Sequence, residues 1–230
     1  MTKAVFRIGD LNSSGFQIEQ DVFSAEECIR FLESIADVLQ KPLPGIRHLM
    51  RHPTVAALAS DQRLLDIATR ALGSSAIPYR ATLFEKSVAA KWLVVWHQDR
   101  ALPLEISFDA PEWGPWSQKS GITYAHAPEW ALSRVVALRV HLDSSKIDNG
   151  PLRIIPKSHL AGVMTEAEVL AYAHDREPYD CLVDRGGVLV MRPLTIHASG
   201  KVQSNEPRRV LHIEYADSLH LAPGIHLAIA

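Results

Sequence analysis

A change in the hydrophobic pattern near residue 77 is the feature that most limits the folds open to this chain. Before it, apolar residues recur at helical spacing; after it, they come in short runs separated by turn residues. The runs are Tyr79–Phe84, Trp92–Trp96, Val135–Leu142, Leu152–Ile155, Val188–Met191 and Val210–Tyr215. Helices followed by many short strands predict a mainly β protein with flanking helices, built on a double-sheet barrel of the jelly-roll type.

Two helices are predicted before the strands. Ser24 and Glu27 form a capping box, which opens a helix whose apolar residues recur as far as Leu39 and which we expect to end before Pro42. A second helix is predicted over Asp61–Leu72, and Gly73 supplies its C-terminal stop.

No repeat or linker divides the chain, so we expect a single domain over residues 1–230. Its helical part would cover about residues 20–75 and its barrel about residues 77–216. One further short helix is predicted to begin at Thr165, at a second capping box. The segment Ala101–Trp130 is long and rich in Trp and Pro, and we interpret it as an ordered lid or wall over a pocket.

Composition excludes several classes of protein. The formal net charge is −2 and no basic run is present, so nucleic-acid binding gains no support. No apolar stretch approaches the roughly 18 residues of a membrane span, and the N-terminus does not resemble a signal peptide. The two cysteines do not indicate a disulfide framework. We therefore expect a cytoplasmic protein that binds neither membrane nor nucleic acid, while its oligomeric state is left open.

A His-x-Asp tripeptide follows one of the apolar runs. Side chains two apart on a strand share a face, so Val95, His97 and Asp99 are expected to point into one cavity. His197 follows a second apolar run and would add a third ligand. Two histidines and one carboxylate leave positions open on Fe(II) for a co-substrate and O₂. The alternative for the tripeptide is a surface histidine and a turn aspartate.

Two consecutive arginines open the last predicted strand. An oxygenase that uses 2-oxoglutarate needs a cation for the distal carboxylate of that co-substrate, and a guanidinium matches a carboxylate with two hydrogen bonds. Arg208 and Arg209 point to opposite faces of the strand. The apolar residues Leu211 and Ile213 share the face of Arg209, which favours Arg209 as the core-facing one. Strand parity does not decide between the two.

Five short motifs together resemble the phytanoyl-CoA dioxygenase family in order and approximate spacing. They are His97-Gln98-Asp99, Asn149-Gly150-Pro151-Leu152, Ile155-Pro156-Lys157-Ser158-His159, His197-Ala198-Ser199 and Pro207-Arg208-Arg209. The resemblance runs from Gly15 to about Tyr215. It implies a double-stranded β-helix with Fe(II) as the metal and 2-oxoglutarate and O₂ as co-substrates. It also implies His97, Asp99 and His197 as the metal ligands.

The same resemblance suggests the residues that hold the co-substrate. In the family the arginine for 2-oxoglutarate lies 11 positions after the distal histidine, which selects Arg208, and a hydroxyl at the position of Ser199 assists it. Arg139 is similar to a residue that lines the co-substrate pocket; a salt-bridged surface arginine is the alternative. Related halogenases have a small residue in place of the carboxylate ligand, so the presence of Asp99 disfavours halogenation.

The resemblance implies hydroxylation of a small-molecule metabolite, with release of succinate and CO₂. Candidate substrate contacts are Trp96, Trp116, Tyr124 and His126, and core packing is the alternative for the two tryptophans. Lys86, Lys91 and Lys119 are interpreted as solvated, and no basic cluster suggests an acyl-CoA.

Two other functions stay open. The same iron site could direct desaturation, epimerisation or cyclisation, because the position of the substrate decides the outcome. A non-catalytic cupin-like module that binds or senses a metal is the alternative from another class. The arginine and serine after His197 argue against it, since such a module needs no site for a dicarboxylate.

Overall fold

The computed structural model describes residues 7–40, 45–87 and 93–230. Its largest sheet is made of β1 (Arg7–Asp10), β2 (Phe16–Glu19), β3 (Gly45–Ile46), β4 (Ile77–Lys86), β9 (Val135–His141), β12 (Val188–Met191) and β14 (Arg208–Ala216). A second sheet is made of β5 (Val94–His97), β10 (Leu152–Ile154), β11 (Tyr179–Cys181) and β13 (His197–Ser199). Smaller sheets are formed by β6 (Ala101–Leu104), β7 (Trp116–Lys119) and β8 (Ile122–His126), and by β15 (His220–Ala222) and β16 (Ile225–His226).

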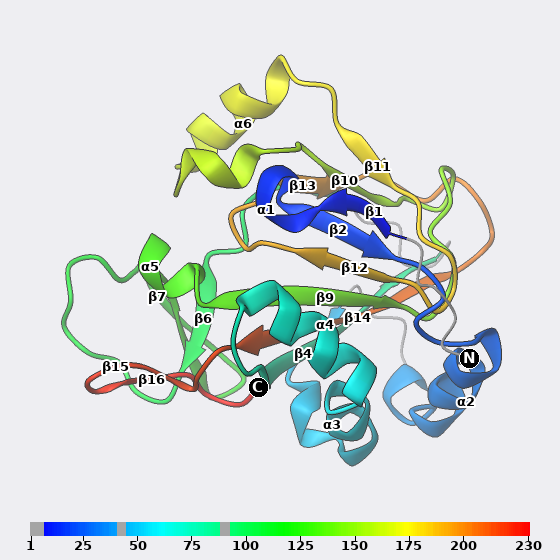
Figure 1. Ribbon diagram of the computed structural model, residues 1–230, viewed down its shortest axis with the longest axis horizontal. Helices are drawn as coiled ribbons and strands as arrows, with labels where there is room; N and C mark the ends of the chain where they lie inside the picture. The colour runs from blue at the N-terminus through cyan, green and yellow to red at the C-terminus, as the bar shows by residue number, and fades with distance from the viewer. Residues whose placement is uncertain (1–6, 41–44, 88–92) are drawn as a thin grey trace.

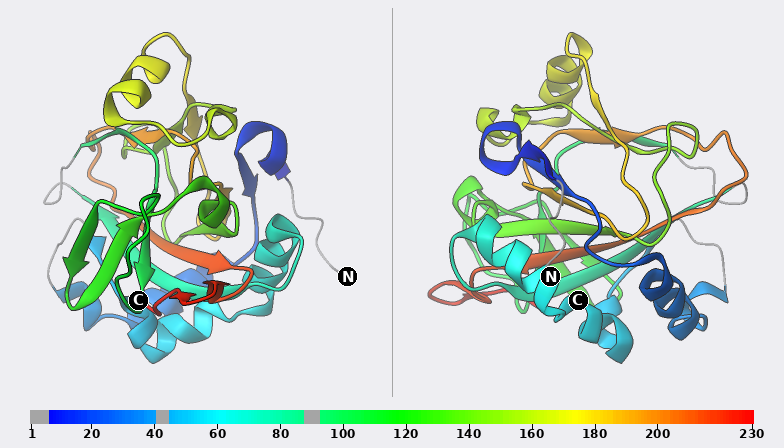
Figure 2. Two further views of the ribbon diagram at one scale, coloured as in Figure 1. Left: turned by 90° about the vertical axis from the view of Figure 1, so that its left-hand side faces the viewer. Right: turned by 45° about the vertical axis from the view of Figure 1, so that its right-hand side comes forward.

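The two main sheets face each other as the walls of a flattened barrel (Figures 1 and 2). The strand order of the major sheet is β1-β2-β12-β9-β14-β4-β3, and that of the minor sheet is β11-β10-β13-β5, with antiparallel pairing throughout. Non-consecutive neighbours such as β12 and β9 are the mark of a jelly roll. The fold is therefore the predicted double-sheet barrel with flanking helices.

Helices cover the barrel on opposite sides. They are α1 (Leu11–Ser14), α2 (Ala25–Ser34), α3 (Pro53–Ala59), α4 (Gln62–Leu72), α5 (Glu129–Leu132) and α6 (Glu166–His174), with 3₁₀ turns at Val38–Gln40, Leu49–Arg51 and Ser158–Ala161. In Figures 1 and 2, α2, α3 and α4 lie under the outer face of the major sheet, and α6 lies beyond the minor sheet. None of the helices in these described ranges is long and apolar enough to cross a membrane.

Alternation along β9 and β14 separates the two faces of the major sheet. Leu138 and Val140 of β9, with Leu211 and Ile213 of β14, belong to the apolar cluster that the helices cover. The residues between them point into the barrel, so the inward face of β14 carries polar side chains. The predicted preference for Arg209 as core-facing is explained here: the apolar face of β14 packs under helices, not inside the barrel.

The local signals for helix ends agree with the structure, with one exception. Both capping boxes form: the Glu27 backbone N–H donates to Ser24 Oγ at 3.2 Å, and Thr165 and Glu168 bond in the same way at the start of α6. Gly73 ends α4 with a positive φ of 72°. The first predicted helix is too long, because α2 ends at Ser34; Pro42 lies outside the described residues.

Candidate active site

Pairing between β13 and β5 brings the two predicted histidine ligands together. His197 and His97 are register partners, and their ring centroids lie 4.2 Å apart. Asp99 follows β5, and its backbone N–H donates to the Pro193 carbonyl at 2.9 Å. Its carboxylate oxygens lie 3.7 Å from His97 Nε2 and 3.5 Å from His197 Nε2. All three candidate ligand atoms lie within 4.8 Å of one another, which one metal ion can bridge.

Backbone contacts determine which ring nitrogen of each histidine carries the proton. His97 Nδ1 lies 2.9 Å from the Val95 carbonyl oxygen, and His197 Nδ1 lies 2.9 Å from the Thr195 carbonyl oxygen. A carbonyl oxygen only accepts, so Nδ1 is the donor in both rings and Nε2 keeps its lone pair. Both lone pairs lie beside the Asp99 carboxylate. This is the tautomer and orientation that a metal-binding histidine needs.

The charge states also suit a metal site. Burial, together with the neighbouring His97, lowers the pKa of His197 to about 3, so its imidazole is neutral at physiological pH. Burial opposes ionisation of Asp99, but the two histidines and Arg80 outweigh it and hold the pKa of this carboxyl well below its usual range. Neutral imidazole and ionised carboxylate are the forms that bind a divalent cation.

A β-bulge changes which residues of β5 accompany the ligands. His97 pairs with His197 but Val94 pairs with Ser199, so β5 holds one extra residue over this stretch. As a result Val94 lines the cavity, while Val95 is 65% exposed. The prediction that Val95 shares the face of His97 is wrong. Trp96 does not line the cavity either, because it packs against the apolar cluster under α6.

A cavity of about 350 Å³ opens between the sheets in front of the three candidate ligands. Arg208 lines it and is only 2% exposed. Its Nε and Nη1 atoms have no hydrogen-bond partner among the described residues. Burial, with Arg139 nearby, lowers the pKa of Arg208 to about 9, so it remains a cation at neutral pH. A buried cation without a partner is costly, and an anionic ligand would relieve that cost.

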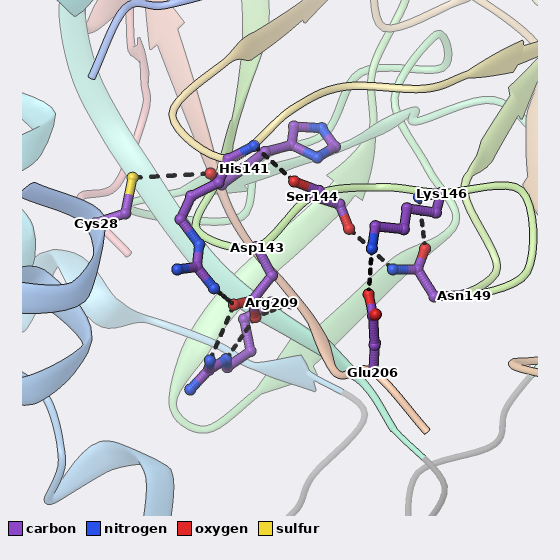
Figure 3. A network of polar contacts seen from close by, with 9 residues as sticks. Cys28, His141, Asp143, Ser144, Lys146, Asn149, Glu206 and Arg209 are labelled. Carbon is purple, nitrogen blue, oxygen red and sulfur yellow. Dashed lines mark hydrogen bonds and ion pairs between the residues drawn. The ribbon is translucent and has the colours of Figure 1, made fainter. Parts of the chain in front are cut away.

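The neighbouring Arg209 has a different position. Its Nε donates to Asp143 Oδ2 at 2.7 Å and its Nη2 donates to Asp143 Oδ1 at 3.0 Å (Figure 3). Arg209 therefore belongs to a polar network outside the cavity, and Arg208 is the member of the pair that faces the metal ligands.

Lys86 was missed as a site residue by the sequence reasoning. It is fully buried rather than solvated, and its Nζ donates to Ser199 Oγ at 2.8 Å and to the Gly200 carbonyl at 2.5 Å. It is the register partner of Arg208. Burial, with Arg208 and Arg139, lowers the pKa of Lys86 to about 7. Strand alternation was the available signal, because Lys86 shares the inward face of β4 with the cavity residues Arg80, Thr82 and Phe84.

Arg139 lies in the cavity wall, 6% exposed, rather than at the surface. Its Nη1 donates to His212 Nδ1 at 3.0 Å, and His212 Nε2 in turn lies 3.1 Å from Glu214 Oε1. Because arginine only donates, His212 Nδ1 accepts and its Nε2–H bonds Glu214. The Glu214 carboxylate also accepts from Tyr79 Oη at 2.7 Å and pairs with Arg80 Nη2 at 2.9 Å. This network gives the cavity floor a fixed arrangement.

The segment Ala101–Trp130 forms the outer wall of the cavity. It is ordered, as predicted, and contains the three-stranded sheet of β6, β7 and β8; Tyr124 and His126 line the cavity. Trp116 does not, because its ring packs edge-on against Phe108 with centroids 5.1 Å apart. Lys119 also lines the cavity, and it is exposed to solvent there, as its interpretation as a solvated lysine expects; Lys91 lies outside the described residues.

Solved structures of similar fold include SnoK, EctD and SnoN. The carbocyclase SnoK from nogalamycin biosynthesis, a non-heme alpha-ketoglutarate-dependent protein, has a TM-score of 0.70 and 16% identity over 90% of this chain and 81% of its own. EctD from S. alaskensis, solved with 2-oxoglutarate and 5-hydroxyectoine, has a TM-score of 0.68 and 21% identity over 90% and 73%. The epimerase SnoN, solved with Fe³⁺, alpha-ketoglutarate and nogalamycin RO, has a TM-score of 0.67 and 15% identity over 91% and 81%.

At these identities the three structures establish the fold. Among curated proteins, none matches this chain. The family model described as phytanoyl-CoA dioxygenase (PhyH) matches residues 11–210, which span α1 to the start of β14 and include all three candidate metal ligands and Arg208. The chain therefore belongs to the phytanoyl-CoA dioxygenase family.

Proposed function

We propose that this protein is an Fe(II)- and 2-oxoglutarate-dependent oxygenase that hydroxylates a small molecule and releases succinate and CO₂. One observation carries the proposal: the His97, Asp99 and His197 ligand atoms converge in the same cavity as the unpartnered, buried guanidinium of Arg208. A metal-binding module alone has no need for a buried cation beside its metal. Family membership and the iron- and 2-oxoglutarate-containing neighbours support the same cofactors.

Different residues of the cavity would bind the metal and the co-substrate. His97, Asp99 and His197 would hold the ferrous ion on one side and leave the side facing the cavity open. Iron with 2-oxoglutarate and O₂ supplies an oxidant strong enough to cleave a C–H bond, and 2-oxoglutarate is decarboxylated to succinate as it forms. Arg208 would bind the distal carboxylate of 2-oxoglutarate with its free N–H groups. Lys86 would keep the Ser199 hydroxyl in place beside it.

Hydroxylation is the outcome that needs the fewest additional assumptions, since it requires only that a substrate carbon lie beside the metal. A second candidate is ring closure or epimerisation, which is favoured by the fold shared with SnoK and SnoN. The position of the substrate in the cavity would decide between hydroxylation and ring closure or epimerisation. A cytoplasmic location is part of the proposal and is supported by Cys28 and Cys181, which are both buried free thiols.

Succinate release provides the test. Purified protein with Fe(II), 2-oxoglutarate and O₂ is expected to form succinate, with a rate that increases when a suitable substrate is added from a metabolite panel. The Arg208→Gln variant should retain iron but lose most of this activity at low 2-oxoglutarate. Stoichiometric iron binding with no succinate under any condition would support the metal-sensing module instead. Mass spectrometry of the oxidised product, a gain of one oxygen or none, distinguishes hydroxylation from ring closure and epimerisation.

A further inference from the structure

A second group of cations lies at the cavity mouth, apart from Arg208 and Arg139. It consists of Arg47, Arg100 and Lys119, which we call the outer cationic cluster. Arg47 directly follows β3, Arg100 precedes β6 and Lys119 ends β7, so separate segments contribute the three side chains. The sequence contains no basic run here, and for that reason the cluster was not predicted.

The outer cationic cluster lacks matching negative charge. Within the described residues, no acidic side chain forms an ion pair with any of its three members. Asp99 is the only carboxylate among the described residues that line the cavity, and it belongs to the candidate metal site. Glu214 lies nearby but is bonded to Arg80 and Tyr79. The cavity mouth therefore has an excess of positive charge, which attracts anions.

Tyr124 lies among these cations and offers a hydrogen-bonding hydroxyl. Lys119 Nζ lies 4.9 Å from the centre of the Tyr124 ring, and Arg80 Cζ lies 5.7 Å from it. The Tyr124 hydroxyl is 3.0 Å from His48 Nε2, which fixes its orientation. Burial, followed by the charges of Arg47 and Arg80, lowers the pKa of Lys119. These cations thus repel one another, and a bound anion would relieve the repulsion.

We propose that the primary substrate carries a carboxylate, which binds between Arg47 and Lys119 beside the Tyr124 hydroxyl. The inference rests on the proposed function, because the remainder of the substrate would extend from this point toward His97 and Asp99 in the same cavity. A guanidinium and an ammonium are donors suited to one carboxylate, and the phenol adds a third when His48 Nε2–H donates to the Tyr124 oxygen and leaves the Tyr124 O–H to donate. The cavity of about 350 Å³ must also hold 2-oxoglutarate, so it fits a small organic acid better than a long acyl chain.

The experiment compares matched ligands on matched proteins. The probes are small carboxylic acids, each paired with its primary amide, which has nearly the same shape and no charge. Binding is measured by saturation-transfer NMR to protein loaded with 2-oxoglutarate and Zn(II), which replaces Fe(II) so that no turnover occurs. The variant Arg47→Gln/Lys119→Gln removes two charges from the mouth. The control Arg30→Gln/Arg176→Gln removes two charges from exposed positions that do not line the cavity.

We expect wild type and the control to prefer acids over their amides, and the Arg47→Gln/Lys119→Gln variant to lose about tenfold in affinity for the acids alone. Equal binding of acid and amide by wild type, or an unchanged preference in that variant, overturns the inference. Tighter binding of a coenzyme A thioester than of its free acid also overturns it. Succinate release is measured for the same proteins. If the proposed function fails, wild type releases no succinate. If only this inference fails, wild type still releases succinate.

Discussion

The two ends of the barrel interior are built from opposite kinds of side chain. Where β2 and β12 face β10 and β11, the space is filled by apolar residues such as Ile18, Ile154 and Leu189. Where β4 and β14 face β5 and β13, it is lined by Arg139, Arg208 and other polar groups around a cavity. Apolar burial stabilises the fold, whereas burying unpartnered charge opposes it. The comparison indicates that one end maintains the structure and the other is arranged for ligands.

The largest expected effect comes from removing a candidate metal ligand at the polar end. Asp99→Ala or His197→Ala should reduce succinate formation by more than about 100-fold, since even indirect support of a metal ligand is worth about 10- to 100-fold. Iron content per protein, measured after dialysis, should fall in parallel. His174→Ala removes an imidazole that is 83% exposed and serves as the control. Full iron occupancy in both ligand variants would remove these residues from the metal site.

Arg208→Gln should separate ligand binding from folding. We expect 2-oxoglutarate affinity to weaken by about 2–5 kcal/mol, the range for losing one side of a buried charge pair. Stability without ligands should stay equal or increase, because an unpartnered buried charge has been removed. Calorimetric titration and thermal unfolding measure the two quantities. Arg209→Gln is the matched variant, and a greater loss of 2-oxoglutarate affinity there would contradict the assignment of Arg208.

At the apolar end we expect a loss of stability with little loss of 2-oxoglutarate affinity. Ile154→Ala leaves a cavity at a fully buried position, and it should lower the free energy of unfolding by about 2–5 kcal/mol. Denaturant unfolding measures this loss. The fraction that remains folded should bind 2-oxoglutarate nearly as wild type does. If affinity fell as far as in Arg208→Gln, the two ends of the barrel would not be independent.

The smallest expected effect is a dependence on pH that comes from Lys86. Burial, with Arg208 and Arg139, lowers the pKa of Lys86 from the ordinary 10.5 to about 7 in the folded protein. Between these values the unfolded chain binds more protons, so the contribution of Lys86 to stability increases as pH rises from 7 toward 10.5. Lys86→Met should lose that increase, on the order of 1–3 kcal/mol. Parallel curves of unfolding free energy against pH for the two proteins would show that the Lys86 pKa is not lowered.

Short-range patterns predicted much of the architecture. Capping boxes at Ser24 and Thr165, and Gly73 with its positive φ, involve contacts within a few residues, so the chain itself carries the signal. Apolar runs indicated the strands because burial requires them. The His97, Asp99 and His197 set was also proposed from the sequence, and the structure brings its ligand atoms together. Their role as iron ligands stays a prediction.

Long-range packing decided the features that the sequence left open or misassigned. Strand parity was misleading at Val95 because a bulge, which depends on pairing with β13, adds a residue to β5. Apolarity favoured Arg209 because nothing local reveals that helices cover one face of β14. The cations at the cavity mouth come from segments far apart in the chain. Residue types and local contacts thus specify elements and candidate ligands, whereas the direction of a buried charge depends on which distant surfaces meet around it.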